Sequence, residues 1–271
     1  MTEAFAHLLR QHRMSRRWSQ EQLGLQAEVS PRHLSCLETC KSQPSREMVL
    51  LLASALDLPL RDRNALLQSA GFVAAYPANS LDSAAMVPIN RAIALLLKQQ
   101  EPYGALVMDR CWNIIAANGG AGRLLSHFLD ESKLPPRIAT NVVRAALHPS
   151  GLRPHLVNWQ DVAALVLERL EREHHLLPRD DERRALLAEV RSYPGVARLQ
   201  PSHSVGGPAA VLHLRRGDTE LRIFSLLTTV GTPLDVTAQE LTVESFFPSD
   251  DVTDLWFRKD AQPSHTRKHQ P

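Results

Sequence analysis

The chain has 271 residues, of which 44% are hydrophobic and 22% charged, and this composition is typical of a folded protein of two domains. Its formal net charge of +2 excludes binding of nucleic acid through overall charge, so DNA affinity would require a local basic surface. Three cysteines without a CxxC pair exclude a disulfide framework. The charged N-terminus is not a signal peptide, and no apolar run reaches the roughly 20 residues that cross a bilayer. We therefore expect a cytoplasmic protein with no membrane contact.

The most informative segment, residues 18–37, has the pattern of two short helices joined by a tight turn. Ser19 is expected to cap the first helix with Gln22 completing a capping box, and Ser30 followed by Pro31 begins the second. The apolar residues that would clamp the two helices together are Leu23, Val29, Leu34 and Leu37. The outward face of the second helix is polar and partly basic, which suits the DNA major groove. The segment therefore predicts a helix-turn-helix.

Three more helices complete a predicted all-α domain over residues 1–74. They are expected at residues 4–14, 45–56 and 61–70. Gly71 is placed to cap the last of them. Residues 75–88 have no hydrophobic periodicity and are interpreted as a linker.

The second half predicts an α+β domain over residues 89–257. A helix at its start precedes a β-hairpin over residues 104–118, and a second hairpin turns at residues 216–218 before a final strand. Further helices are expected at residues 141–147, 159–173 and 181–191. Consecutive hairpins predict an antiparallel sheet of about five strands with helices covering one face. The polar tail, residues 258–271, is expected to be disordered.

These segments resemble a known pair of domains. Residues 30–72 are similar to the xenobiotic-response-element class of helix-turn-helix domains. The phrases EPYGALVMDRCWNIIAAN, NVVRAALHPSGLRPHLVNW and GTPLDVTAQELTVESFFPSDD resemble the ligand-binding domain of MmyB-like transcription regulators. The resemblance implies a PAS-like second domain with a long-chain fatty acid in its cavity and no other cofactor. It also implies a bacterial regulator that acts as a homodimer on a double-stranded DNA operator.

The chain departs from this helix-turn-helix class at two turns. Such domains usually carry glycine at the positions that here hold Glu28 and Cys40. A non-glycine residue in a left-handed backbone conformation costs about 1 kcal/mol, so we expect strained turns at both positions.

The resemblance implies seven DNA-contacting residues in the first domain. Those expected to touch phosphate or add charge near the DNA backbone are Arg13, Gln20 and Lys41. Those expected to face base edges are Ser30, Pro31, Arg32 and Cys36. Arg32 is the best candidate for specificity, because a bidentate guanidinium–guanine pair is worth roughly 1–3 kcal/mol of discrimination.

The second domain is expected to hold its ligand beneath the helices that cover the sheet. Met108 and Ile114 are candidate apolar lining residues. The candidate anchors for a carboxylate head group are Tyr103, Arg144, His148 and Arg153. An ordinary core would show the same period-two pattern, so the alternation does not distinguish a cavity wall from a core.

No arrangement of residues typical of catalysis is present, and we expect no enzymatic activity. The sequence contains no GxSxG, GxGxxG or P-loop, and its histidines have no metal-ligand spacing such as HExxH. Cys36 and Cys40, four residues apart, are interpreted as unactivated small residues rather than a redox switch. Two alternative functions remain open at this stage. They are a lipid or small-molecule carrier whose helix-turn-helix mediates protein contacts, and a haem- or flavin-binding PAS sensor.

Overall fold

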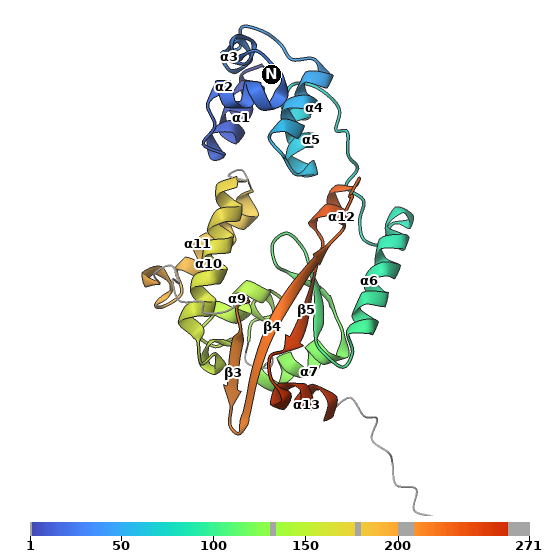
Figure 1. The fold of residues 1–271 in the computed structure, drawn as a ribbon, viewed down its shortest axis with the longest axis vertical. Coiled ribbons are helices and arrows are strands. Elements are labelled where there is room, and N and C mark those ends of the chain that lie inside the picture. Colours follow the sequence, from blue (N-terminus) through green and yellow to red (C-terminus); the bar gives the residue numbers. More distant parts are fainter. Residues whose placement is uncertain (1, 131–133, 177–179, 200–208, 260–271) are drawn as a thin grey trace, which may run out of the picture. The chain divides into compact units, whose positions relative to one another are not determined.

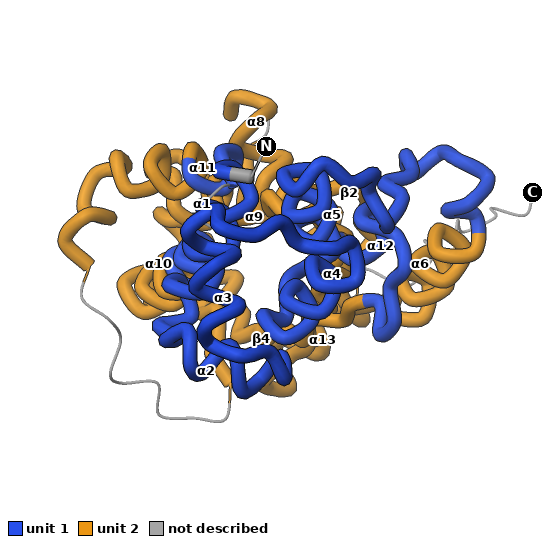
Figure 2. Tube along the Cα trace, turned by 90° about the horizontal axis from the view of Figure 1, so that it is seen from above, with its two compact units in different colours: residues 1–87, 170–184, 230–240 blue, residues 88–169, 185–229, 241–271 orange. Residues whose placement is uncertain are grey.

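The computed structural model describes residues 2–130, 134–176, 180–199 and 209–259, and Figure 1 traces its helices and strands. The chain divides into two compact units, which Figure 2 colours separately. The first comprises residues 1–87, 170–184 and 230–240, and the second residues 88–169, 185–229 and 241–271. None of the described helices combines the length and the apolar composition that crossing a bilayer requires.

Five helices around one apolar core form the body of the first unit. They are α1 (Thr2–Ser15), α2 (Gln20–Ala27), α3 (Pro31–Glu38), α4 (Arg46–Ala55) and α5 (Leu60–Ser69). The core side chains Leu23, Leu34 and Leu37, which clamp α2 against α3, are at most 1% exposed. Val29 packs against them while partly exposed. The predicted helix-turn-helix is therefore confirmed in its elements and in its packing.

The helix starts follow the capping chemistry that the sequence predicts. The Ser19 hydroxyl accepts from the Gln22 amide at 3.0 Å, and the Gln22 side chain accepts from the Ser19 amide at 2.7 Å, so the capping box is complete. Ser30 and Ser45 likewise accept from backbone amides at the starts of α3 and α4. Each cap satisfies one of the amides that the first turn of a helix leaves without a partner.

A short helix that the sequence did not predict, α12 (Val236–Glu240), also belongs to the first unit. Arg61 of α5 forms a two-pronged ion pair with Glu240, at 2.6 and 2.8 Å. The Leu60 amide donates to Gln239 Oε1 at 2.6 Å. Pro59, which precedes α5, offers no side-chain cap, so Gln239 supplies the acceptor that the start of α5 lacks.

The second unit contains a five-stranded antiparallel sheet. Its strands are β1 (Ala105–Met108), β2 (Ile114–Ala117), β3 (Leu212–Arg216), β4 (Thr219–Thr229) and β5 (Thr242–Pro248). The order across the sheet is β2-β1-β5-β4-β3, which confirms both predicted hairpins and the α+β class. The last strand, β5, pairs with β1 on one side and β4 on the other.

The remaining helices connect and flank this sheet. They are α6 (Val87–Gln100), α7 (Gly119–Phe128), α8 (Pro136–Ala139), α9 (Val142–Leu147), α10 (Trp159–Leu176), α11 (Asp181–Arg191) and α13 (Asp251–Lys259), with 3-10 turns at residues 84–86, 153–155 and 196–198. Gly120 allows α7 to begin directly against the start of β1, because a Cβ there would lie 2.5 Å from the Tyr103 backbone. The expectation of a tail from residue 258 is wrong for residues 258 and 259, which are helical, and residues 260–271 lie outside the described part.

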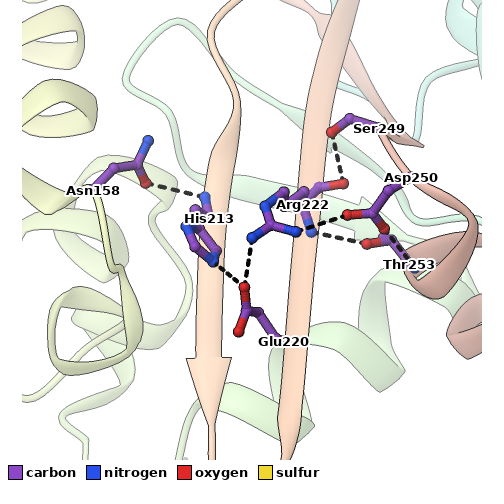
Figure 3. Close-up of polar contacts among 7 residues, drawn as sticks. All are labelled: Asn158, His213, Glu220, Arg222, Ser249, Asp250 and Thr253. Carbon is purple, nitrogen blue, oxygen red and sulfur yellow. Dashed lines mark hydrogen bonds and ion pairs between the residues drawn. The ribbon is translucent and has the colours of Figure 1, made fainter.

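A polar network ties α13 to the β3–β4 hairpin (Figure 3). Glu220 accepts from Arg222 at 2.6 Å and lies 2.8 Å from the His213 ring nitrogen, and Arg222 also pairs with Asp250 at 3.2 Å. The Arg222 amide donates to the hydroxyl of Thr253, in the first turn of α13, at 2.9 Å. His213 and Arg222 are register partners and lie on the face opposite to their neighbours Leu212 and Ile223. The sheet therefore has one polar and one apolar face along this hairpin.

One buried ion pair joins α1 to the end of α3 in the first unit. The Arg13 guanidinium donates twice to Glu38, at 2.7 and 2.8 Å, and once to the Trp18 carbonyl at 2.6 Å. Gln20 adds a third hydrogen bond to Glu38 at 2.8 Å. Burial alone would raise the pKa of Glu38, but these hydrogen bonds and the arginine charges outweigh it, so the pKa lies below its ordinary value.

We predict that Glu38→Gln destabilises the first unit by about 3 kcal/mol, because it leaves the Arg13 charge buried without a carboxylate. Urea unfolding of the full chain measures this, with Glu21→Gln on the exposed face of α2 as the matched control, expected within about 0.5 kcal/mol of the wild type. The Glu38 contribution is present above the unfolded-state pKa and is lost as the pH falls through the lowered folded-state pKa. The difference between wild type and Glu38→Gln should therefore shrink in acid. Equal stability of E38Q and E21Q at neutral pH contradicts the prediction.

A second prediction concerns Glu28, which has φ 54° and ψ 36° at the end of α2, so the expected left-handed turn is present. Glu28→Gly should be more stable than Glu28→Ala by about 1 kcal/mol, since alanine retains the steric conflict of a left-handed residue. The same pair at Gln26, inside α2, should rank in the opposite order by roughly 0.5–1 kcal/mol. Urea unfolding of the four variants compares them, and an E28A variant as stable as E28G would show that the turn is unstrained.

Candidate functional site

The outward side of α3 presents several of the residues that the sequence predicts to contact DNA. Pro31 and Arg32 are exposed in its first turn, Lys41 is exposed just beyond its end, and Cys36 is half-buried. The Ser30 hydroxyl accepts from the His33 amide at 3.2 Å, so its side chain is occupied as the helix cap. Arg32 and Lys41 therefore place two exposed positive charges on α3 and just beyond its end.

Arg13 and Gln20 occupy different positions from these exposed residues. Arg13 is 9% exposed and its guanidinium is committed to Glu38 and Trp18, while Gln20 donates to the same carboxylate. Through their hydrogen bonds to Glu38, these two side chains hold the C-terminal end of α3 in place, a role that the sequence analysis did not assign. Phosphate contact by these two residues stays a prediction.

A cavity of about 70 Å³ lies in the second unit between the apolar face of the sheet and its covering helices. The sheet contributes Leu106, Ile114, Leu212, Leu214, Ile223, Glu244 and Phe246. The covering side contributes Leu124, Leu125, Val142, Ala145, Ala146 and Leu152. An engineered cavity of about 150 Å³ holds one benzene molecule, so this one has room for a small group only. The described lining is apolar except for Glu244.

Glu244 is the functional candidate that the sequence analysis missed. It lies on β5 opposite Leu106 of β1 and Leu227 of β4, and its carboxyl bonds with the Ser225 side chain. Its Oε2 atom is buried without a hydrogen-bond partner. The sequence did contain a signal for this position. Alternate residues of a strand share a face, so an acidic residue two positions before the apolar Phe246 is expected to lie on the same face as that side chain.

The predicted ligand residues are only partly brought together. Ile114 lines the cavity, whereas Met108 is buried on β1 and is not among the described lining residues. Nor are the four polar candidates among them, and each has other contacts. Tyr103 bonds with Asp254 and Arg258, and Arg144 pairs with Glu189 at 2.9 Å.

The other two polar candidates are held in the same way. The His148 ring accepts from the Ser150 amide at 3.1 Å and packs edge-on against Tyr193. The Arg153 guanidinium lies 3.7 Å from the centre of the Trp159 ring. An anchoring role for any of these four side chains stays a prediction.

Comparison with known proteins gives two family matches. A helix-turn-helix domain matches residues 4–66, and the MmyB-like transcription regulator ligand binding domain matches residues 89–259. No curated protein matches the chain at a significant level. Among solved structures, the chain is similar to an RNA-binding light-oxygen-voltage receptor, with 12% identity over 95% of this chain and 62% of that one. The TM-score of 0.27 is too low for that likeness to carry an argument.

One matched family is a helix-turn-helix domain and the other is the ligand-binding domain of a transcription regulator, and neither family description is that of an enzyme. Their order agrees with the two structural features described above, two exposed basic residues on and just beyond α3 in the first unit and an apolar cavity in the second. The protein is therefore a ligand-regulated, DNA-binding transcription regulator. Because the ligand-binding match alone covers more than half of the 271 residues, the chain belongs to the family of MmyB-like transcription regulators.

Proposed function

We propose that this regulator binds a DNA operator as a cytoplasmic homodimer and that a small hydrophobic ligand, with a fatty acid as the expected class, sets its affinity for the operator. The observation that carries this proposal is the cavity, whose described lining is apolar except for one carboxyl group. A wall of this kind favours the apolar body of a ligand and leaves one polar group to orient it. Each protomer would present α3 to one half-site, with half-sites about 34–36 Å apart.

The chain offers a covalent route from the cavity to the helix-turn-helix. Ile223 of β4 and Glu244 of β5 both line the cavity, and the segment that connects these two strands includes α12. Within the first unit, Glu240 of α12 pairs with Arg61 of α5. A change in the path of either strand would therefore be transmitted along the backbone to α12, which is bonded to α5 of the DNA-binding unit.

The small volume of the cavity supports regulation rather than passive binding. About 70 Å³ is less than half of the volume that holds benzene, so an acyl chain can enter only if lining side chains move. The filled and unfilled states must then differ in packing. A ligand shifts the equilibrium between two such states by its difference in affinity for them, which is the thermodynamic requirement for a switch.

We predict that Arg32→Ala lowers operator affinity by about 5- to 150-fold and relaxes the base preference at one position, because it removes a bidentate contact worth roughly 1–3 kcal/mol. Sequence selection in vitro would define the operator, and fluorescence anisotropy on the selected DNA would measure the affinity. The control is Arg91→Ala, which removes an exposed arginine of α6 in the second unit. Wild-type affinity and base preference in R32A would refute the proposed role of α3.

We also predict that Ala146→Leu abolishes ligand regulation by adding three carbon atoms to the cavity wall. Operator affinity would be measured with and without decanoate or decan-1-ol. In the wild type at least one of these probes should change it, whereas in A146L neither should, with basal affinity kept. Ala117→Leu, on the exposed side of β2, is the matched control and should respond like the wild type. Unchanged wild-type affinity at saturating probe would refute ligand regulation but not DNA binding.

A further inference from the structure

Strand β4 is longer than its neighbour β3, so its second half has an open edge. β3 pairs with β4 only as far as Leu212 opposite Ile223, and Figure 1 shows β4 continuing beyond that point. On its other side, β4 stays paired with β5 up to Thr229. Among the described strands, none pairs with residues 224–229 on the β3 side. The sheet therefore ends there in an unpaired strand edge.

The backbone groups of alternate β4 residues point out of this edge. The Ser249 amide donates to the Arg222 carbonyl at 2.9 Å, so Arg222 and every second residue after it bond toward β5. The residues between them direct their amide and carbonyl groups to the other side of the strand. Ser225, Leu227 and Thr229 therefore present backbone donors and acceptors along the open edge.

The side chains of the open edge are apolar and uncharged. Leu226 is 55% exposed and Leu227 is 41% exposed, and as consecutive strand residues they lie on opposite faces of the sheet. Residues 223–230, IFSLLTTV, include neither a charged residue nor a proline. Folded proteins commonly protect an edge strand with such residues, because an unprotected edge pairs with another chain. The second half of β4 therefore has the properties of a strand that pairs with a partner.

A second copy of this chain fits this edge. An antiparallel strand edge complements itself about a twofold axis, since each backbone donor of one copy then meets an acceptor of the other. If residues 225–229 align with the same residues of a second copy, Leu227 lies opposite its own counterpart, and Ser225 lies opposite Thr229. The pairing brings no like charges together, because this stretch of β4 carries none.

We propose that the homodimer forms by antiparallel pairing of the second half of β4 with the same strand of a second copy, which joins the two sheets into one. This inference rests on the proposed homodimer and names its interface. β4 also lines the cavity through Ile223, and its Ser225 bonds with Glu244 of the cavity wall. A ligand that displaces β4 would therefore act on the strand that sets the geometry of the dimer.

Cysteine crosslinking of the full chain tests the register of this pairing. The exposed or half-buried Cys36 and Cys40 are first replaced by serine, and the buried Cys111 is kept. Leu227→Cys should then form a disulfide-linked dimer under oxidation with copper phenanthroline, because hydrogen-bonded antiparallel residues have Cα atoms about 5.5 Å apart. Leu226→Cys should crosslink about tenfold less, since its counterpart lies two positions out of line, beyond the roughly 7 Å that a disulfide can bridge.

Sedimentation velocity measures the same interface without a new cysteine. Leu227→Lys should weaken self-association by about tenfold or more, because two lysines would meet at the twofold axis. Ile115→Lys is the matched control, since Ile115 is also 41% exposed and lies on the other edge strand, β2. Its self-association should equal that of the wild type, and circular dichroism would establish that both variants are folded.

The outcomes separate the interface from the homodimer itself. Equal dissociation constants for L227K and I115K, or equal crosslinking of L226C and L227C, would overturn the β4 interface and leave the proposed homodimer standing. A wild type that is monomeric both in solution and on the selected operator DNA would overturn the homodimer together with this inference.

Discussion

The pairing of β5 with both β1 and β4 is the constraint on which the second unit depends. β5 is the last strand in the chain, yet it is central in the sheet, with Ala105–Met108 on one side and the second half of β4 on the other. The sheet is therefore incomplete until residues separated by more than a hundred positions have met. Because the apolar face of this sheet is one wall of the cavity, the cavity also forms only when β5 is in place.

The same strand brings polarity into an apolar site. A one-residue slip of β5 would turn Glu244 away from the cavity and move its neighbours Val243 and Ser245 onto that face. Register is thus as important as composition for the chemistry of this wall. The short helix α12, which precedes β5 in the chain, is held against α5 by Arg61 and Glu240, so one continuous segment contacts α5 at one end and lines the cavity at the other. This continuity gives a physical basis for coupling that does not depend on a long chain of side-chain contacts.

Sequence alone determined the local features of the first unit. Ser19, Gln22, Ser30 and Ser45 make their capping bonds with amides at most three residues away, so the helix starts are local events that a pattern can reveal. The left-handed backbone of Glu28 was expected from the resemblance, because such helix-turn-helix domains usually carry glycine at that position. The two hairpins and the antiparallel sheet likewise followed from short-range alternation and turn residues.

Only the tertiary structure decided which polar side chains have partners. The guanidinium of Arg13, a residue predicted to contact phosphate, is bonded to Glu38, 25 residues away, and the phosphate contact itself stays a prediction. The candidate anchor Arg144 is paired with Glu189. Glu244 lines the cavity, although the sequence of its strand is typical of an ordinary core strand. Charge and hydrogen-bonding capacity can be read from a residue's identity, whereas its partner depends on distances between segments far apart in the chain. For that reason the sequence determined most of the elements and the class of protein, and the packing of those elements decided which side chains remain available to a ligand or to DNA.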